Sequence, residues 1–550
     1  MAEEQHVDGP EPPATEAGSA LRTATRGALI SAALILLSRI TGLARDMVIL
    51  GVFGQNRYTD CFKAALQVPD LLFFLIAGGV LSSSFMPTYA EYRQKHGEDE
   101  AWELCSVVLT LWTLFAVVLV TVGELFAVPL VRGLATPGPE WTQQQIAFVV
   151  TMTRIVLPAQ IAFFVGGVLM GIQWVRRDFV IPGIGPTVYN LGIMIGGAIG
   201  GALLGGRGVI GLVWGGVAGA FVGNFALQLY GVWRYRPKLR FSLNWRHEGA
   251  QRVLILMLPV IFSLSMPQVD VQINKWFAAF LPAGMLSALD TAYRLMLLPV
   301  GVVGQGVATS FYATMTNLAA AERMAEYRET VVGGLRQLAA VALPATALLV
   351  VLRVPVVAVL FERGKFDRAD TLLVAAALAV YALGIYFWCA EQLLGRAFYA
   401  LRDTMTPPWS GTVVTVIFIA LDWLLMRLFI ARWGEGAGYL GLALATTLAA
   451  GLYCGTLLLL LRRKVGGLGL RALAVSTGKA VAASLVAALV AWAMMRVLAT
   501  AQADTPLLSL LLGGAAGTMA YAGAARSLGL SEAIVLADRL MGRLRRDNHK

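Results

Sequence analysis

The chain contains 550 residues, of which 57% are hydrophobic and 14% charged, and its mean hydropathy is +0.69. A soluble domain of this length cannot bury so much apolar surface, so the composition excludes a soluble globular protein and indicates a membrane protein. The formal net charge of +11 does not require a nucleic-acid partner, because Lys and Arg collect in the cytoplasmic loops of membrane proteins.

The N-terminal segment is polar and acidic, and we expect a disordered cytoplasmic tail over residues 1–23. A membrane-spanning helix needs about 20 predominantly apolar residues. Fourteen segments meet this requirement, which predicts an all-α polytopic membrane protein. They are 27–52, 60–88, 104–134, 145–173, 179–204, 208–233, 251–281, 284–317, 331–361, 370–400, 406–431, 437–461, 473–498 and 505–527.

The first candidate span carries three charged residues, Arg39, Arg45 and Asp46. A charge inside the bilayer is costly, so such residues normally face a cavity and mark a substrate or ion path. Because successive residues of a helix turn by about 100°, Arg39 and Asp46 share a face, and Arg45 lies within about 120° of both. The arginines therefore either bind an anion in a cavity or form ion pairs, with Asp46 or Asp60, that fix helix packing.

The second candidate span places Asp60, Lys63 and Asp70 on one polar stripe. Lys63 would add positive charge to a basic cavity lined by Arg39. Asp60 opens the span, so it could instead cap its own helix.

Basic residues orient the chain in the membrane. The connection 233–252 is dense in Arg and Lys, and basic residues also follow the second, fourth, eighth, tenth and twelfth spans. These loops fall on one side only if both termini are cytoplasmic. Residues 531–550 form a basic cytoplasmic tail, which we expect to lie on the anionic inner leaflet.

A weak internal repeat relates residues 171–190 to residues 395–414, since each has a Gly, an aromatic residue, Arg-Asp and then Pro. Two similar halves are typical of transporters whose binding site lies between them. We therefore predict two pseudo-symmetric six-helix lobes and a C-terminal helix pair. The predicted boundaries are 24–235 for the N-lobe, 236–465 for the C-lobe and 466–530 for the pair.

The seventh and eighth candidate spans also carry polar residues. In the eighth, Asp290 and Arg294 share a face and either line a cavity or form an i, i+4 ion pair. In the seventh, Asp270 and Asn274 offer oxygen ligands for Na⁺ or H⁺, or else they are partners of Arg294.

The sequence contains no P-loop, GxSxG or HExxH motif, and its four His residues lie in tails or loops. We therefore expect neither an enzyme nor an ATP-driven pump. Transport would run on an ion gradient or on the membrane potential, and no cofactor is expected beyond coupled Na⁺ or H⁺.

Several motifs carry a family resemblance as a set: SRITGLARD (38–46), TDCFKAALQVPDLL (59–72), SSSFMPTYAEY (82–92), ALDTAYRLMLLPVGVVGQGVAT (288–309) and LLGRAFYALRDTMTP (393–407). With these motifs the chain resembles the MurJ/MviN family of lipid II flippases, a branch of the MOP exporter superfamily. The resemblance implies fourteen helices, two lobes around a cationic cavity, and a final helix pair that shapes a lipid groove.

The resemblance also implies a function and a location. The protein would lie in the bacterial cytoplasmic membrane and flip an undecaprenyl-pyrophosphate-linked peptidoglycan precursor by alternating access. Its partners would be that precursor, membrane lipids, and cell-wall synthesis or division proteins.

The resemblance assigns the family's cavity arginines to Arg39, Arg45 and Arg294, and its acidic residue at the start of the second helix to Asp60. Lys63 completes the expected substrate-binding set. The candidates for cation ligands are Asp270, Asn274 and Asp403.

The chain departs from the family pattern in the second helix. Many members carry Arg-Arg and a Glu where this sequence has Phe73, Phe74 and Gly78, so a pyrophosphate clamp would rest on fewer charges. Two other functions therefore stay open. One is export of another polyprenyl-linked glycan or an amphiphile; a cationic cargo would need a carboxylate-rich cavity, and Arg39, Arg45 and Arg294 argue against it. The other is a non-transporting membrane scaffold, which the missing arginine would favour.

Overall fold

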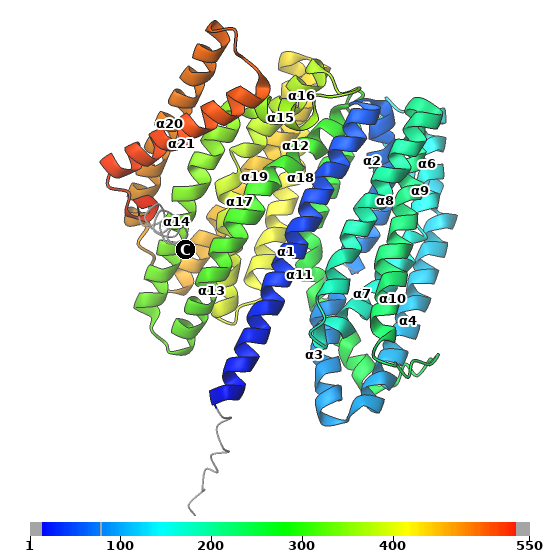
Figure 1. Ribbon diagram of the computed structural model, residues 1–550. Helices are drawn as coiled ribbons and strands as arrows, with labels where there is room; N and C mark the ends of the chain where they lie inside the picture. Colours follow the sequence, from blue (N-terminus) through cyan, green and yellow to red (C-terminus); the bar gives the residue numbers. More distant parts are fainter. Residues whose placement is uncertain (1–13, 77–79, 535–550) are drawn as a thin grey trace, which may run out of the picture.

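The computed structural model describes residues 14–76 and 80–534, and within these residues it consists of helices without strands. Figure 1 shows two groups of helices on either side of the long helix α1 (Ala14–Phe53). The group from the first half of the chain comprises α2 (Arg57–Ile76), α3 (Val80–Lys95), α4 (Glu98–Leu125), α5 (Ala127–Leu130), η1 (Val131–Ala135), α6 (Gln143–Val156), α7 (Ala159–Val175), α8 (Val180–Leu204), η2 (Gly205–Gly208), α9 (Val209–Gly219), η3 (Ala220–Ala226) and α10 (Leu227–Trp233).

The second half of the chain forms the other group and a final helix pair. The group comprises α11 (Glu248–Ala278), α12 (Met285–Pro299), η4 (Val300–Gly304), α13 (Gln305–Ala320), α14 (Met324–Val351), α15 (Arg353–Phe361), α16 (Arg368–Ala382), α17 (Ile385–Ala400), α18 (Thr406–Trp433), η5 (Glu435–Ala437) and α19 (Gly438–Lys464). The pair is α20 (Leu470–Thr500) and α21 (Pro506–Ser527), which pack on each other and on α14.

The all-α polytopic class predicted from the sequence is confirmed. Within the described residues, nine helical stretches are long and apolar enough to cross a membrane, and α16 with α17, bent by 43°, would add a tenth. The predicted count of fourteen is not confirmed. The helices α1, α2 and α11 carry the charged residues of interest and are not among the nine.

One of the nine stretches, Val180–Trp233, is 54 residues long and folds back on itself as α8 and α9. Small residues allow the two backbones to touch, as they do where transmembrane helices pack closely. A Cβ atom on Gly196 would lie 2.1 Å from the carbonyl oxygen of Gly211, and one on Gly200 would lie 2.3 Å from that of Gly208. The partner's numbers fall as those of α8 rise, so the two helices are antiparallel.

The N-terminal segment differs from the expectation. Helix α1 begins at Ala14, so residues 14–23 of the expected disordered tail are helical. Residues 1–13 lie outside the described part of the chain, as do residues 535–550 of the expected basic tail.

The two copies of the internal repeat form the same turn. Arg177 and Arg402 have positive φ angles of 62° and 59° at the ends of their helices. In each copy the following Asp donates its backbone N–H to the carbonyl oxygen five residues earlier, at 2.9 and 3.0 Å, which closes the helix end. Its side chain then accepts a hydrogen bond from the backbone N–H of the first residue of the next helix. The matching turns support the two-lobe interpretation.

Helix α11 connects the two lobes. Its early residues Ala250, Val253 and Met257 belong to an apolar core with residues of α3, α4 and α7 of the N-lobe, whereas the helix also packs on α18 and α19 of the C-lobe. The expected C-lobe, residues 236–465, therefore begins with turns of α11 that pack against helices of the N-lobe.

Candidate functional site

The charged face of α1 lies opposite α12 and η4, which run antiparallel to it between the lobes. Arg294 of α12 is close enough to Asp46 for the two charges to interact. Arg39 lies seven residues before Asp46 on α1, and Gly301 of η4 lies seven residues after Arg294. The guanidinium group of Arg39 lies against Gly301. The contact between Asp46 and Arg294 and the contact between Arg39 and Gly301 are therefore about two helical turns apart on both helices. Arg39 and Arg294 thus face one space.

Arg39 has no hydrogen-bond or ion-pair partner among the residues that the structure describes. Its side chain is half-buried. Its position depends on Gly301, because a Cβ atom on that residue would lie 2.0 Å from Nη1 of Arg39. A glycine therefore allows the guanidinium to lie directly on the helix backbone.

Arg45, in contrast, donates a hydrogen bond from each of its three guanidinium nitrogens. Its Nε and Nη2 atoms donate to Oδ1 of Asp46 at 3.0 and 2.8 Å, and its Nη1 donates to Oδ1 of Asn190 at 3.0 Å. The ion-pair interpretation of Arg45 describes this conformation, in which the pair with Asp46 lies within α1 and the hydrogen bond to Asn190 joins α1 to α8.

Asp290 is the centre of a charged network that joins the lobes. It accepts from Nζ of Lys63 at 2.5 Å and from Nε of Arg294 at 2.9 Å, and Nζ of Lys275 lies 3.8 Å away. Lys275 also lies 3.9 Å from Asp70. The expected i, i+4 ion pair of Arg294 with Asp290 is present, and the Arg294 side chain is 41% exposed and lies near Asp46. Its expected role in a cavity stays a prediction.

The cations of this region outnumber its carboxylates, so the space carries a positive potential. The region comprises Arg39, Arg45, Lys63, Lys275 and Arg294 with Asp46, Asp70 and Asp290, and is called the inter-lobe cluster below. It can bind a compact anion with two negatively charged groups.

Asp60 does not join the inter-lobe cluster. Its carboxylate is fully buried and accepts hydrogen bonds from the backbone N–H of Gly284 at 2.6 Å and from N and Oγ of Ser287 at 2.9 and 2.6 Å. It therefore caps α12 of the other lobe rather than its own helix. In this conformation Asp60 is a contact between the lobes, and its expected role as a substrate contact stays a prediction.

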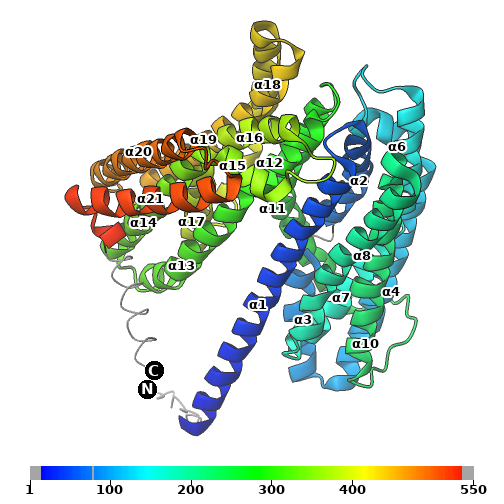
Figure 2. The same ribbon diagram turned by 45° about the horizontal axis from the view of Figure 1, so that its top comes forward.

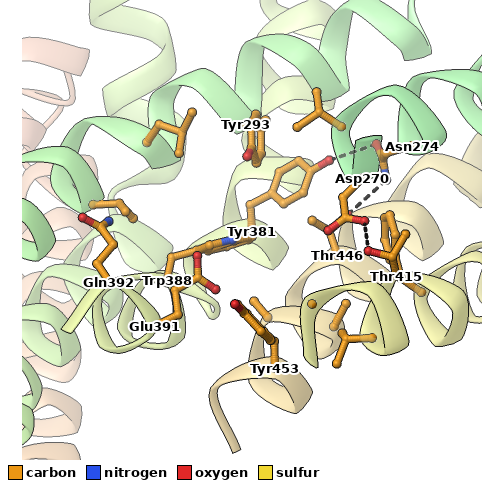
Figure 3. A pocket seen from close by; sticks show the side chains of 18 of the residues that line it. Asp270, Asn274, Tyr293, Tyr381, Trp388, Glu391, Gln392, Thr415, Thr446 and Tyr453 are labelled. Atoms are coloured by element: carbon orange, nitrogen blue, oxygen red, sulfur yellow. Dashed lines mark hydrogen bonds between the residues drawn. The ribbon is translucent and has the colours of Figure 1, made fainter. Parts of the chain in front are cut away.

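Two of the three cation candidates, Asp270 and Asn274, line one cavity of the C-lobe four residues apart on α11, whereas Asp403 lies elsewhere. Asp270 accepts from Oγ1 of Thr415 at 2.7 Å, and Nδ2 of Asn274 donates to Oγ1 of Thr446 at 3.0 Å (Figure 3). Asp403 lies in the loop before α18 and contacts neither. Although burial acts to raise its pKa, hydrogen bonds from Lys464 and from Thr406 lower the pKa of Asp403 to about 2.

Several residues of interest were absent from the expected site. Glu391 and Asp422 are single carboxylates in apolar helices, and the cost of intramembrane charge would have singled them out. Gly301 has no charged or polar side chain that would have singled it out in the sequence. At the position of the missing arginine, Phe73 lines a cavity. The side chain of Phe74, and Gly78 as a whole, are outside the part of the chain that the structure describes.

No group of three or more His, Cys, Asp or Glu side chains in the described residues is arranged to hold a metal ion. The geometry of the site therefore rests on guanidinium, ammonium and carboxylate groups.

Comparisons with known proteins give consistent matches over most of the chain. A family model described as "Lipid II flippase MurJ" matches residues 49–511. A lipid II flippase MurJ of Burkholderia cenocepacia is 31% identical over 386 residues, which cover 70% of this chain and 74% of that protein. A probable lipid II flippase MurJ of Synechocystis is 28% identical over 486 residues, which cover 86% and 88%.

Solved structures share the fold. A structure described as lipid II flippase MurJ in an inward-closed conformation has a TM-score of 0.73 at 22% identity and covers 91% of this chain and 99% of its own. An inward-facing multidrug resistance MATE family transporter of the MOP superfamily has a TM-score of 0.61 at 11% identity, covering 80% and 98%.

Proposed function

The chain belongs to the MurJ family of lipid II flippases, and we propose that it moves lipid II, an undecaprenyl-pyrophosphate-linked peptidoglycan precursor, from the inner to the outer leaflet by alternating access. The observation that carries the proposal is the unpartnered guanidinium of Arg39, which shares one space with the 41% exposed Arg294. Guanidinium groups bind phosphate oxygens in a bidentate manner, so two of them suit a diphosphate.

The substrate-binding role is divided among the cations of the inter-lobe cluster. Arg39 and Arg294 contact the pyrophosphate, because each has donor atoms that no group in the described part of the chain uses. Lys63 contributes charge while it holds Asp290, and Arg45 fixes α1 against α8. This assignment narrows the expected set to two direct contacts in the present conformation.

Contacts between the lobes close one end of the molecule. One of these contacts is the cap that Asp60 forms on α12. In addition, Nε2 of Gln55 donates to the carbonyl oxygen of Gly284 at 3.0 Å, and the backbone N–H of Lys365 donates to the carbonyl oxygen of Gly51 at 2.8 Å. Figure 2 shows the lobes meeting around the C-terminal end of α1 and diverging toward its N-terminal end. Alternating access requires these contacts to break when that end opens.

We assign the closed end to the outside and both termini to the cytoplasm. The turns between α3 and α4 and between α13 and α14, which carry basic residues, lie at the same end as the start of α1 (Figure 1). The rule that basic loops stay in the cytoplasm supports this orientation.

The driving force is an ion gradient or the membrane potential. An inside-negative potential favours outward movement of an anionic headgroup by about 2.3 kcal/mol per charge at 100 mV. A diphosphate therefore gains free energy from the potential alone, and Asp270 and Asn274 remain the candidates for a coupled cation.

Complementation tests the function directly. The chain, expressed in a bacterium depleted of its own lipid II flippase, should restore growth. Arg39→Ala should fail at equal membrane abundance, and Glu435→Gln, which removes an exposed charge in η5, should succeed. Wild-type protein that reaches the membrane without restoring growth would favour the scaffold interpretation.

A further inference from the structure

A separate pocket lies where the first turns of α20 meet α14 and the chain that follows α21. Its volume is about 550 Å³, and its charged and hydroxyl side chains are Arg336, Arg471, Ser476, Lys479 and Glu532; it is called the C-terminal pocket below. Figure 1 shows α20 and α21 packed together beside α14. None of these five residues belongs to the inter-lobe cluster, so the pocket is distinct from the proposed lipid II site.

One face of α20 carries two of the pocket's cations. Arg471, Val475 and Lys479 follow one another at intervals of four residues, so they lie on one side of the helix, and Ser476 lies in the adjacent row. Beyond these turns, α20 contains a stretch that is apolar enough to cross a membrane. A long basic side chain near the end of such a helix extends its charged group toward the lipid headgroups, which places the pocket at the membrane surface.

Several donors of the C-terminal pocket have no acceptor among the residues that the structure describes. Ser476 is 4% exposed, and its Oγ atom is buried without a hydrogen-bond partner. The Nε atom of Arg336 is buried in the same way. Arg471 and Lys479 form no hydrogen bond or ion pair within the described part of the chain. Because a buried donor without an acceptor costs free energy, a ligand rich in acceptor oxygens would be stabilised here.

The chain supplies an anion of its own to one side of the pocket. Oε1 of Glu532, which follows α21, lies 2.5 Å from Nη2 of Arg336, and the Glu532 side chain is 14% exposed. Among the described residues that line the pocket, three cations surround this single carboxylate, so the potential there is positive. The pocket thus already accepts one anionic group, and Arg471, Lys479 and Ser476 are left for a second one.

We propose that the C-terminal pocket binds the phosphate group of an anionic membrane lipid. The phosphate oxygens accept charge-assisted hydrogen bonds from Arg471 and Lys479 and a further hydrogen bond from Ser476. Val475, which is 54% exposed between the two cations, offers apolar surface to the acyl chains, and a free phosphate ion would not use it. In the orientation assigned above, this end of α20 is cytoplasmic, so the lipid belongs to the inner leaflet, whose anionic lipids attract clustered basic residues.

Competition binding to the purified full chain in detergent tests the proposal, with a fluorescent phosphatidylglycerol as the probe. Unlabelled phosphatidylglycerol should displace the probe at a concentration about tenfold below that of phosphatidylcholine, whose headgroup carries no net charge, since a charge-assisted contact contributes about a factor of ten in affinity. Arg471→Gln with Lys479→Gln should weaken probe binding by about tenfold for the same reason. Arg496→Gln, the same kind of change near the other end of α20, is the matched control and should leave probe binding unchanged.

Single variants decide the question if thermal unfolding shows that the double variant does not fold. Lys479→Gln should weaken binding and Lys479→Arg, which retains the charge, should not. Glu532→Gln removes the competing carboxylate and should tighten binding, an effect that a purely structural role of Glu532 would not produce.

Equal displacement by the two lipids, or a double variant that binds the probe like the wild type, would overturn the proposal. Displacement by inorganic phosphate at the same concentration as phosphatidylglycerol would also overturn it, because the site would then take a free anion. Lipid II flipping is measured separately, so failure of the C-terminal pocket to bind a lipid is distinguishable from failure of the proposed function.

Discussion

Replacing Arg39 by Ala separates substrate binding from stability. Arg39 forms no hydrogen bond or ion pair in the described structure, so its removal leaves no buried charge without a partner. We expect the free energy of unfolding to change by less than about 1 kcal/mol. Loss of a charge-assisted contact with pyrophosphate should cost about 1.5–3 kcal/mol of binding free energy, which weakens the affinity for lipid II by about 10- to 150-fold.

Lipid II binding to the purified variant in nanodiscs, together with thermal unfolding, measures both effects. Lys63→Ala is the contrasting variant, because Lys63 is buried and lies 2.5 Å from Asp290. It should lower the free energy of unfolding by about 1–3 kcal/mol, as expected when a buried carboxylate loses a partner. Arg39→Lys should also weaken binding, since an ammonium group cannot reproduce a bidentate contact. Wild-type affinity in Arg39→Ala would refute the assignment of Arg39 to the substrate.

The remaining predictions concern Gly301, the closed end and the topology. Gly301→Ala should displace the Arg39 guanidinium, since the new Cβ atom would lie 2.0 Å from its Nη1 atom, and should slow lipid II flipping. The melting temperature should change little, because the flexible end of the Arg39 side chain can move. An unchanged flipping rate would contradict this. Asp60→Ala should remove three hydrogen bonds to the start of α12, cost about 1–3 kcal/mol, and increase thiol accessibility of the closed end; a variant as stable and closed as the wild type would argue against a contact between the lobes. In a background without the four native cysteines, all buried, Asn244→Cys should resist an impermeant maleimide in intact cells and Gln502→Cys should react; the reverse pattern would invert the topology.

The sequence predicted the helices well where the chain is uniformly apolar, because helix formation there satisfies every backbone group inside the bilayer. The predicted helix boundaries differ from the observed ones where charged residues or a bend interrupt a span. The 43° bend between α16 and α17 falls beside Gly384, and no charge or proline marks it. Residues 14–23 are helical because they continue α1, although their composition alone favours disorder.

The candidate site was predictable in its residue types but not in its pairings. Intramembrane charge identified Arg39 and Arg294, since an exposed charge in lipid is too costly to be accidental. It did not identify the partner of each charge, because the contact between Lys63 and Asp290 joins residues 227 positions apart and depends on how the lobes approach. The role of Gly301 depends on the same approach and leaves no trace in the sequence.

The most direct test of the central claim is lipid II flipping by the purified chain in proteoliposomes, followed with a fluorescent lipid II whose outer-leaflet fraction is quenched by an added reagent. The wild type should equilibrate the probe between leaflets, faster when the potential drives the anion outward, and a chain with both Arg39→Ala and Arg294→Ala should not. The two substitutions should also be non-additive, because both residues contact one diphosphate. A correctly folded wild type that leaves the probe in its original leaflet, or a double variant that flips it at the wild-type rate, would contradict the account.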